Sequence, residues 1–92
     1  MATLTPEQTA SELAQTPGWT ISDGQLTRTV TGKDFRDSLL FVNAVGFLAE
    51  RAGHHPDLSV SWNKVTLFLV THSEGGLTGN DFALARQISQ LC

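Results

Sequence analysis

The sequence predicts an α+β fold in which three helices cover one face of a four-stranded antiparallel sheet. Three capping patterns indicate helix starts, and four short β-prone segments occur as two consecutive pairs. Because strands joined by short turns pair antiparallel, the two pairs are expected to share one sheet with the helices gathered on one face. The expected order is α-β-β-α-β-β-α, in a single domain over residues 1–92.

The first helix is predicted by Thr5-Pro6-Glu7-Gln8. Thr5 can cap free backbone N–H groups, Pro6 suits the first helical position, and Gln8 completes a capping box. Thr16-Pro17-Gly18 ends the helix. Its short apolar face consists of Ala10, Leu13 and Ala14.

A β-hairpin is predicted next. Trp19–Ser22 and Leu26–Val30 have strand composition and flank Asp23-Gly24. An Asp-Gly pair favours a tight hairpin turn because glycine adopts positive φ without strain.

The second helix is predicted from a capping box at Thr31-Gly32-Lys33-Asp34 and an apolar stripe after it. Gly53 is placed as its C-terminal cap, and Pro56 disfavours helical backbone at His55. The stripe is expected to lie against the core. It comprises Phe35, Leu39, Val42, Gly46 and Ala49, widened by Leu40, Phe47 and Leu48.

The second hairpin is predicted over Leu58–Trp62 and Val65–Thr71, with Asn63-Lys64 as the turn. Its second strand is expected to turn two sets of side chains to opposite faces. One set is Val65, Leu67 and Leu69, and the other is Thr66, Phe68, Val70 and His72.

A third capping box, Thr78-Gly79-Asn80-Asp81, predicts the last helix. Its inward residues are expected to be Phe82, Ala85, Ile88 and Leu91.

Composition narrows the classes of function. The 92 residues include 6 basic and 9 acidic side chains, for a net charge of −3, whereas nucleic-acid binders carry a basic patch. The longest apolar runs, such as Leu67–Val70, are far shorter than the roughly 20 residues of a membrane span. The start shows no basic and apolar secretory pattern, and the single cysteine, Cys92, allows no intramolecular disulfide. These features predict a reducing compartment, the cytoplasm, with no nucleic-acid or membrane partner.

The candidate chemistry centres on three histidines. His54 and His55 follow the long helix, whose dipole favours a protonated imidazole there, and His72 is expected at a strand end. Imidazoles in different environments can divide acid and base duties. Structural interpretations stay open as well: a polar helix stop for the pair and a hydrogen-bonded core histidine for His72. Likewise, Asp81 can act as a cap and Glu50 as a solvated surface residue.

Two other site types have less support. Three imidazoles and a water would suit catalytic zinc, but adjacent histidines need an irregular backbone to meet at one ion. Nucleophilic catalysis lacks a serine in a nucleophile-elbow pattern. We therefore expect no metal site.

The second half of the sequence resembles pterin-4a-carbinolamine dehydratases. The resemblance is carried by Glu50–Asp57, Trp62–Val65, Leu69–His72, Gly76–Thr78 and Asp81–Ala85, and Lys33–Phe35 is consistent with it. It implies an enzyme that dehydrates 4a-hydroxytetrahydropterin to quinonoid dihydropterin in the recycling of tetrahydrobiopterin. It also implies no metal or organic cofactor, the same α+β fold, and a homodimer or homotetramer.

The resemblance further implies the roles of site residues. His54 and His72 should approach the 4a-hydroxyl, with His55 as a second acid/base group and Asp81 orienting an imidazole. An ordinary imidazole pKa of about 6.5 suits both proton donation and removal at neutral pH. The expected pterin-binding residues are Glu50, Gly53, Pro56, Trp62, Val70, Thr71 and Ser73.

Some residues depart from the family pattern. Trp62 stands where tyrosine is common in the family. Leu58 stands where animal members carry an aromatic residue, and Gly53 stands where they carry an acidic residue. The residues at these last two positions resemble those of bacterial members. These differences leave the choice of pterin open.

The family also offers non-catalytic alternatives. Animal members act as cofactors of a homeodomain transcription factor, and some bacterial relatives resemble Rubisco assembly chaperones. Because chaperone-like members tend to lose the histidines, their presence here favours the enzyme. A third alternative is a module that binds pterin without turnover.

Overall fold

The elements of the computed structural model, which describes residues 2–92, follow the predicted order. A short 3-10 helix, η1, is added before the last helix. The bounds are α1 Pro6–Ala14, β1 Thr20–Ser22, β2 Gln25–Thr31, α2 Phe35–Ala52, β3 Asp57–Ser61, β4 Lys64–Leu69, η1 His72–Glu74 and α3 Gly79–Ser89.

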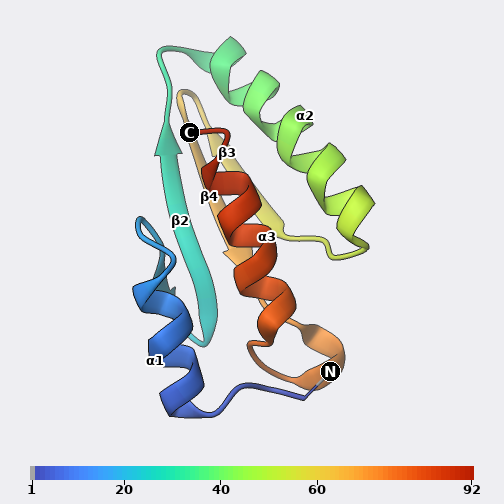
Figure 1. Cartoon of the computed structure of the whole chain (residues 1–92). Helices are drawn as coiled ribbons and strands as arrows, with labels where there is room; N and C mark the ends of the chain where they lie inside the picture. The colour runs from blue at the N-terminus through green and yellow to red at the C-terminus, as the bar shows by residue number, and fades with distance from the viewer. Residues whose placement is uncertain (1) are drawn as a thin grey trace.

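The strands form one antiparallel sheet in the order β1-β2-β4-β3, which makes β2 and β4 the central strands. The turn between β1 and β2 has positive φ at Asp23 (53°) and Gly24 (75°), the geometry that favours an Asp-Gly pair. Figure 1 shows α3 running along the sheet in front of β4, with α1 and α2 on either side of it. The predicted fold class is confirmed.

The core lies between the sheet and α3, with a contribution from α2. Its buried apolar side chains are Trp19, Leu26, Val45, Ala49, Val65, Leu67, Leu69, Phe82, Leu84, Ala85 and Ile88. Along β4, Val65, Leu67 and Leu69 are buried, as predicted. The predicted inner face of α3 is also buried, with the exception of Leu91. That side chain is 42% exposed because α3 ends at Ser89, so Leu91 no longer follows the spiral of the helix.

The predicted inner face of α2 is largely wrong. Most of its apolar side chains face solvent: Phe35 is 50% exposed, Leu39 45%, Leu40 59% and Phe47 79%. The helix instead buries a narrow stripe made by Ser38, Val45 and Ala49, with Val42 and Leu48 half-buried beside it. Apolar residues occupy more than one side of this helix, so their spacing could not show which side meets the core.

The start of α2 also differs from the prediction. Thr31 belongs to β2, and the N-cap is Asp34, whose side chain accepts a hydrogen bond from the backbone N–H of Asp37. The other two capping boxes, Thr5 with Gln8 and Thr78 with Asp81, are confirmed.

Most predicted strand ends are shifted by one or two residues, and three of these shifts move a residue of interest. β4 ends at Leu69, so His72 begins η1 instead of ending a strand. The turn of the second hairpin is formed by Trp62 and Asn63, with Trp62 at φ 51°. Trp19 precedes β1 and is buried in the hydrophobic core, where its Nε1 donates to Ser89 Oγ at 2.8 Å.

Within residues 2–92, the structure contains no helix with the length and apolar character needed to cross a membrane.

Candidate active site

His54 is directed toward the interior by the way α2 ends. Gly53 adopts the left-handed conformation, with φ 65°, and its N–H bonds to carbonyls of the last helical turn. This reverses the chain, and the backbone N–H of His54 donates to Ala49 O at 3.1 Å. The His54 side chain is 14% exposed, and its Nε2 lies 2.5 Å from Oδ1 of Asp81.

Asp81 is a fully buried carboxylate in the first turn of α3. Its Oδ2 accepts hydrogen bonds from Thr78 N and from Thr71 Oγ1, each at 2.8 Å, while Oδ1 faces His54. Burying a carboxylate is costly unless hydrogen bonds replace its water, and the positive end of the helix dipole also favours it here. One oxygen therefore caps α3 and the other holds an imidazole, so a single side chain makes both predicted contacts.

Three segments of the chain meet at this carboxylate. His54 follows α2, Thr71 follows β4, and Thr78 caps α3. The two threonine hydroxyls lie 2.8 Å apart, and both residues are buried. We name the group His54, Asp81, Thr71 and Thr78 the carboxylate cluster.

The hydroxyl of Thr78 was missed from the sequence, which indicated only its capping role. Thr71 was expected to bind substrate. A signal was present, since these two threonines bracket the loop between β4 and the capping box.

His55 is paired away from the carboxylate cluster. Its Nε2 lies 2.5 Å from Glu50 Oε2, and these side chains are 63% and 78% exposed. An exposed contact of this kind adds little stability, even when both groups are charged. Glu50 also lines a cavity of about 390 Å³ between α2 and β3, together with Phe47 and Leu58.

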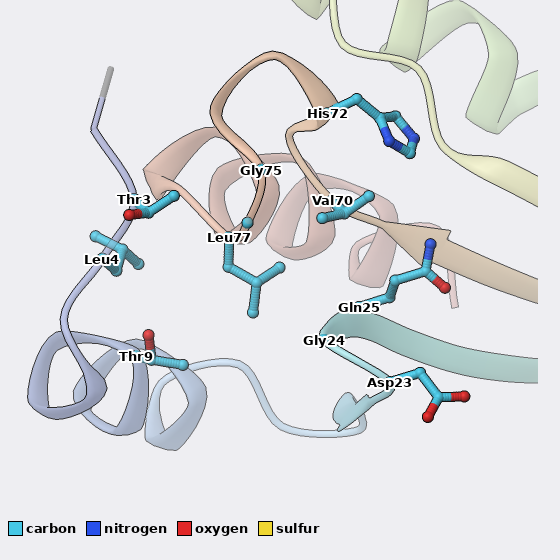
Figure 2. A pocket seen from close by; sticks show the side chains of 11 residues that line it. Thr3, Leu4, Thr9, Asp23, Gly24, Gln25, Val70, His72, Gly75 and Leu77 are labelled. Carbon is cyan, nitrogen blue, oxygen red and sulfur yellow. The ribbon is translucent and has the colours of Figure 1, made fainter.

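His72 is exposed and lines a different cavity, of about 580 Å³. Figure 2 shows this cavity between the N-terminal segment, the β1–β2 turn and the loop that follows β4. Its walls include apolar Leu4 and Leu77 and polar Asp23 and Gln25. The lining contains Val70, His72 and Leu77 but no member of the carboxylate cluster, so the cavity adjoins the cluster only through residues that neighbour Thr71 and Thr78 in sequence.

The remaining predicted binding residues are divided between the two ends of the sheet. Gly53 and Pro56 flank the histidine pair, and Ser73 lies in η1 beside His72. Trp62 is 66% exposed at the opposite end of the β3–β4 hairpin, about 15 Å from the start of β3 at the usual rise per residue. The structure therefore does not bring Trp62 together with the histidines of the same chain.

The geometry also bears on the zinc alternative. Among residues 2–92, no three histidine, cysteine, aspartate or glutamate side chains are grouped so that they could hold a metal ion. The His54 ring is committed to Asp81 and the His55 ring to Glu50. The arrangement is instead suited to proton transfer, because a buried carboxylate stabilises a protonated imidazole and fixes its orientation.

Comparison with known proteins identifies the family. The model of the pterin 4 alpha carbinolamine dehydratase family matches residues 2–91. This chain belongs to that family. The resemblance first carried by Glu50–Ala85 therefore extends over nearly the whole sequence.

Individual relatives agree with this assignment. A protein of Thermosynechococcus vestitus named "Putative pterin-4-alpha-carbinolamine dehydratase" is 50% identical over 88 residues, covering 96% of this chain and 93% of the relative. One of the same name from Nocardia farcinica is 49% identical with the same coverage. A crystal structure described as a transcriptional coactivator/pterin dehydratase from Brucella melitensis superposes with a TM-score of 0.91 at 33% identity, covering 97% of each chain.

Proposed function

We propose that this protein dehydrates 4a-hydroxytetrahydropterin to quinonoid dihydropterin and water. The observation that carries the proposal is the buried Asp81 carboxylate holding Nε2 of His54 at 2.5 Å. Membership of the pterin-4a-carbinolamine dehydratase family supplies the substrate class.

The reaction needs two proton movements. The C4a–O bond breaks as a proton reaches the leaving hydroxyl, so that water departs, and a ring nitrogen loses its hydrogen to form the new C=N bond. Imidazoles can perform both transfers at neutral pH. We assign these transfers to His54, His72 and His55, with Asp81 stabilising His54 while it carries a proton.

The pterin is proposed to lie across the loop between β4 and η1. Backbone groups around Val70, Thr71 and Ser73 would meet the flat ring from one side, and Gly53 with Pro56 would bound it from the other. Glu50 would act through His55, to which it is bonded. Trp62 is left out of this site because it lies at the far end of the hairpin.

We also propose that the protein forms a homodimer or homotetramer. The outer side of α2 exposes Phe35, Leu39, Leu40 and Phe47, and exposed apolar patches of this kind commonly mark protein interfaces. β3 is an edge strand with every residue exposed, and unpaired edges readily take a partner strand. Light scattering at working concentration tests this, and a monomer would contradict it.

The alternative function is protein binding without catalysis, as a transcriptional cofactor or an assembly chaperone. The solved relative from Brucella melitensis is described as both coactivator and dehydratase, and the exposed side of α2 could serve such a partner. Retention of all three histidines favours the enzyme. Location in the cytoplasm stays a prediction of the sequence.

The deciding experiment is stopped-flow absorbance with chemically generated 4a-hydroxytetrahydropterin. Wild type should accelerate dehydration, and His54→Ala should lower turnover by about 10²-fold or more. Gln90→Ala, at an exposed position after α3, serves as the control and should match wild type. No acceleration by folded wild type would favour the protein-binding alternative, and an active His54→Ala variant would remove His54 from the mechanism.

A further inference from the structure

A chain of buried hydrogen bonds leads from Thr78 through Thr71 and Asp81 to His54. Thr78 Oγ1 and Thr71 Oγ1 lie 2.8 Å apart, and Thr71 Oγ1 donates to Asp81 Oδ2 at 2.8 Å. Asp81 Oδ1 then meets His54 Nε2. Thr78 and Asp81 are 0% exposed and Thr71 is 7% exposed, so water cannot readily replace any of these partners.

The direction of each hydrogen bond follows from counting hydroxyl hydrogens. A threonine hydroxyl has one hydrogen to donate, and that of Thr71 goes to the carboxylate. The hydrogen between the two threonines must therefore come from Thr78. The oxygen of Thr78 accepts in turn from the backbone N–H of Asn80 at 3.2 Å. Every hydrogen in the chain thus points toward Asp81.

This arrangement fixes the carboxylate in one orientation. Oδ2 receives two donors, the Thr71 hydroxyl and the Thr78 backbone N–H, both at 2.8 Å. Oδ1 is the oxygen left for the imidazole. A carboxylate oxygen can only accept, so Nε2 of His54 carries a hydrogen, and in the neutral ring Nδ1 keeps the lone pair.

We propose that Thr71 and Thr78 are positioning residues, which hold Asp81 so that His54 stays in the tautomer with its hydrogen on Nε2 and its lone pair on Nδ1. That tautomer would present Nδ1 to the pterin, a last step that rests on the proposed function. The sequence led us to expect that Thr71 binds substrate. Its hydroxyl instead acts on Asp81, which leaves only its backbone for the pterin.

The tautomer can be observed directly by nitrogen NMR of the ring. In wild type labelled with ¹⁵N and held at a pH where His54 is neutral, two-bond ¹H–¹⁵N spectra should show a hydrogen-bearing Nε2 and a bare Nδ1. The ring signals that are missing from the spectrum of His54→Ala are assigned to His54. Thr71→Val, which removes the hydroxyl but keeps the shape, should leave Asp81 held by the Thr78 N–H alone. The carboxylate can then turn away from the ring in part of the molecules, and the neutral ring in those molecules should carry its hydrogen on either nitrogen. Thr71→Ser should restore the wild-type pattern.

Kinetics supplies a second readout that a merely structural role would not produce. Thr71→Val should lower kcat by about 10- to 100-fold, the equilibrium effect of losing a hydrogen bond to a charged group, and leave KM within a factor of about two. Thr71→Ser should recover most of kcat. Thr29→Val, on the open face of the sheet where Thr29 bonds Thr66, is the matched control and should behave as wild type.

Two results would overturn the inference. One is a wild-type ring with its hydrogen on Nδ1, which can be seen even if Thr71→Val fails to fold. The other is a raised KM with unchanged kcat in Thr71→Val, which would return Thr71 to substrate binding. The NMR measurement needs no substrate, so an inactive wild type that shows the expected tautomer, together with a mixture in Thr71→Val, would refute the proposed function while supporting the positioning role.

Discussion

Replacing Asp81 with asparagine tests the link between the carboxylate cluster and proton transfer most directly. The side chain keeps its shape, but one oxygen becomes an NH₂ group. Thr71 and Thr78 both donate to the Oδ2 position, so the amide oxygen must take that place. The NH₂ group then faces Nε2 of His54, which can accept its hydrogen only if the ring hydrogen moves to Nδ1. Asp81→Asn should therefore reverse the tautomer of His54.

The expected loss of stability follows from the contacts of Asp81. Two hydrogen bonds to a charged acceptor become hydrogen bonds to a neutral one, a loss of about 1 kcal/mol each. Relief from burying a charge offsets part of this loss. The net change should be about 1–2 kcal/mol, which lowers the melting temperature by roughly 5–15 °C in a domain of this size. Turnover should fall by about 10²-fold or more, because the imidazole loses both its orientation and its stabilising charge.

The assay combines thermal unfolding at fixed protein concentration with stopped-flow dehydration. Asp37→Asn is the matched control, because Asp37 Oδ2 accepts from the backbone N–H of Lys33 near the start of α2, far from His54. It should lose some stability and keep full turnover. Turnover of Asp81→Asn within a factor of about three of wild type would show that His54 does not depend on the carboxylate, and the reasoning would be refuted.

Three further outcomes are expected. Gly53→Ala should lower the free energy of unfolding by about 1–2 kcal/mol, because alanine is strained in the left-handed conformation. It should also reduce turnover, because His54 is the next residue. The control Gly24→Ala, also at positive φ with open space around it, should lose a similar free energy of unfolding without losing turnover. Glu12→Gln should lower the free energy of unfolding, measured by urea titration, by at most about 1 kcal/mol, because the 2.9 Å ion pair between Glu12 and Arg86 is partly exposed. A loss several times larger would indicate that Glu12 contributes to the core. Phe47→Ser should weaken self-association in light scattering and leave the dehydration rate per folded chain unchanged; an oligomer unaffected by the change would place the interface elsewhere.

Local signals in the sequence predicted most of the fold. The capping boxes at Thr5 and Thr78, the Asp23-Gly24 turn and the helix end at Gly53 each depend on residues within about four positions of one another. Such signals are decided by backbone geometry and hydrogen bonding, which tertiary contacts here did not override. The α2 capping box failed because β2 extends to Thr31, so pairing with β4 determined the conformation of that residue.

Features that depend on contacts between distant segments could not be predicted in the same way. The sequence could not show that α2 buries Val45 and leaves Phe47 exposed, since both sides of the helix are apolar. It suggested that Asp81 orients an imidazole but not which one, and the partner is His54, 27 residues away. The part played by Thr71 required knowing that β4 ends beside the first turn of α3.

The hydrogen bond between His54 and Asp81 joins the segment directly after α2 to the first turn of α3 and thereby couples the site to the opening motions of a whole helix. α2 buries few side chains, so it belongs among the elements that detach most readily in local unfolding. Each detachment would carry His54 away from Asp81. A pterin analogue that engages His54 would bind only the docked form, and by mass action it should slow amide hydrogen exchange in α2. Ligand binding at one end of this helix would then protect the helix without any change in the average structure.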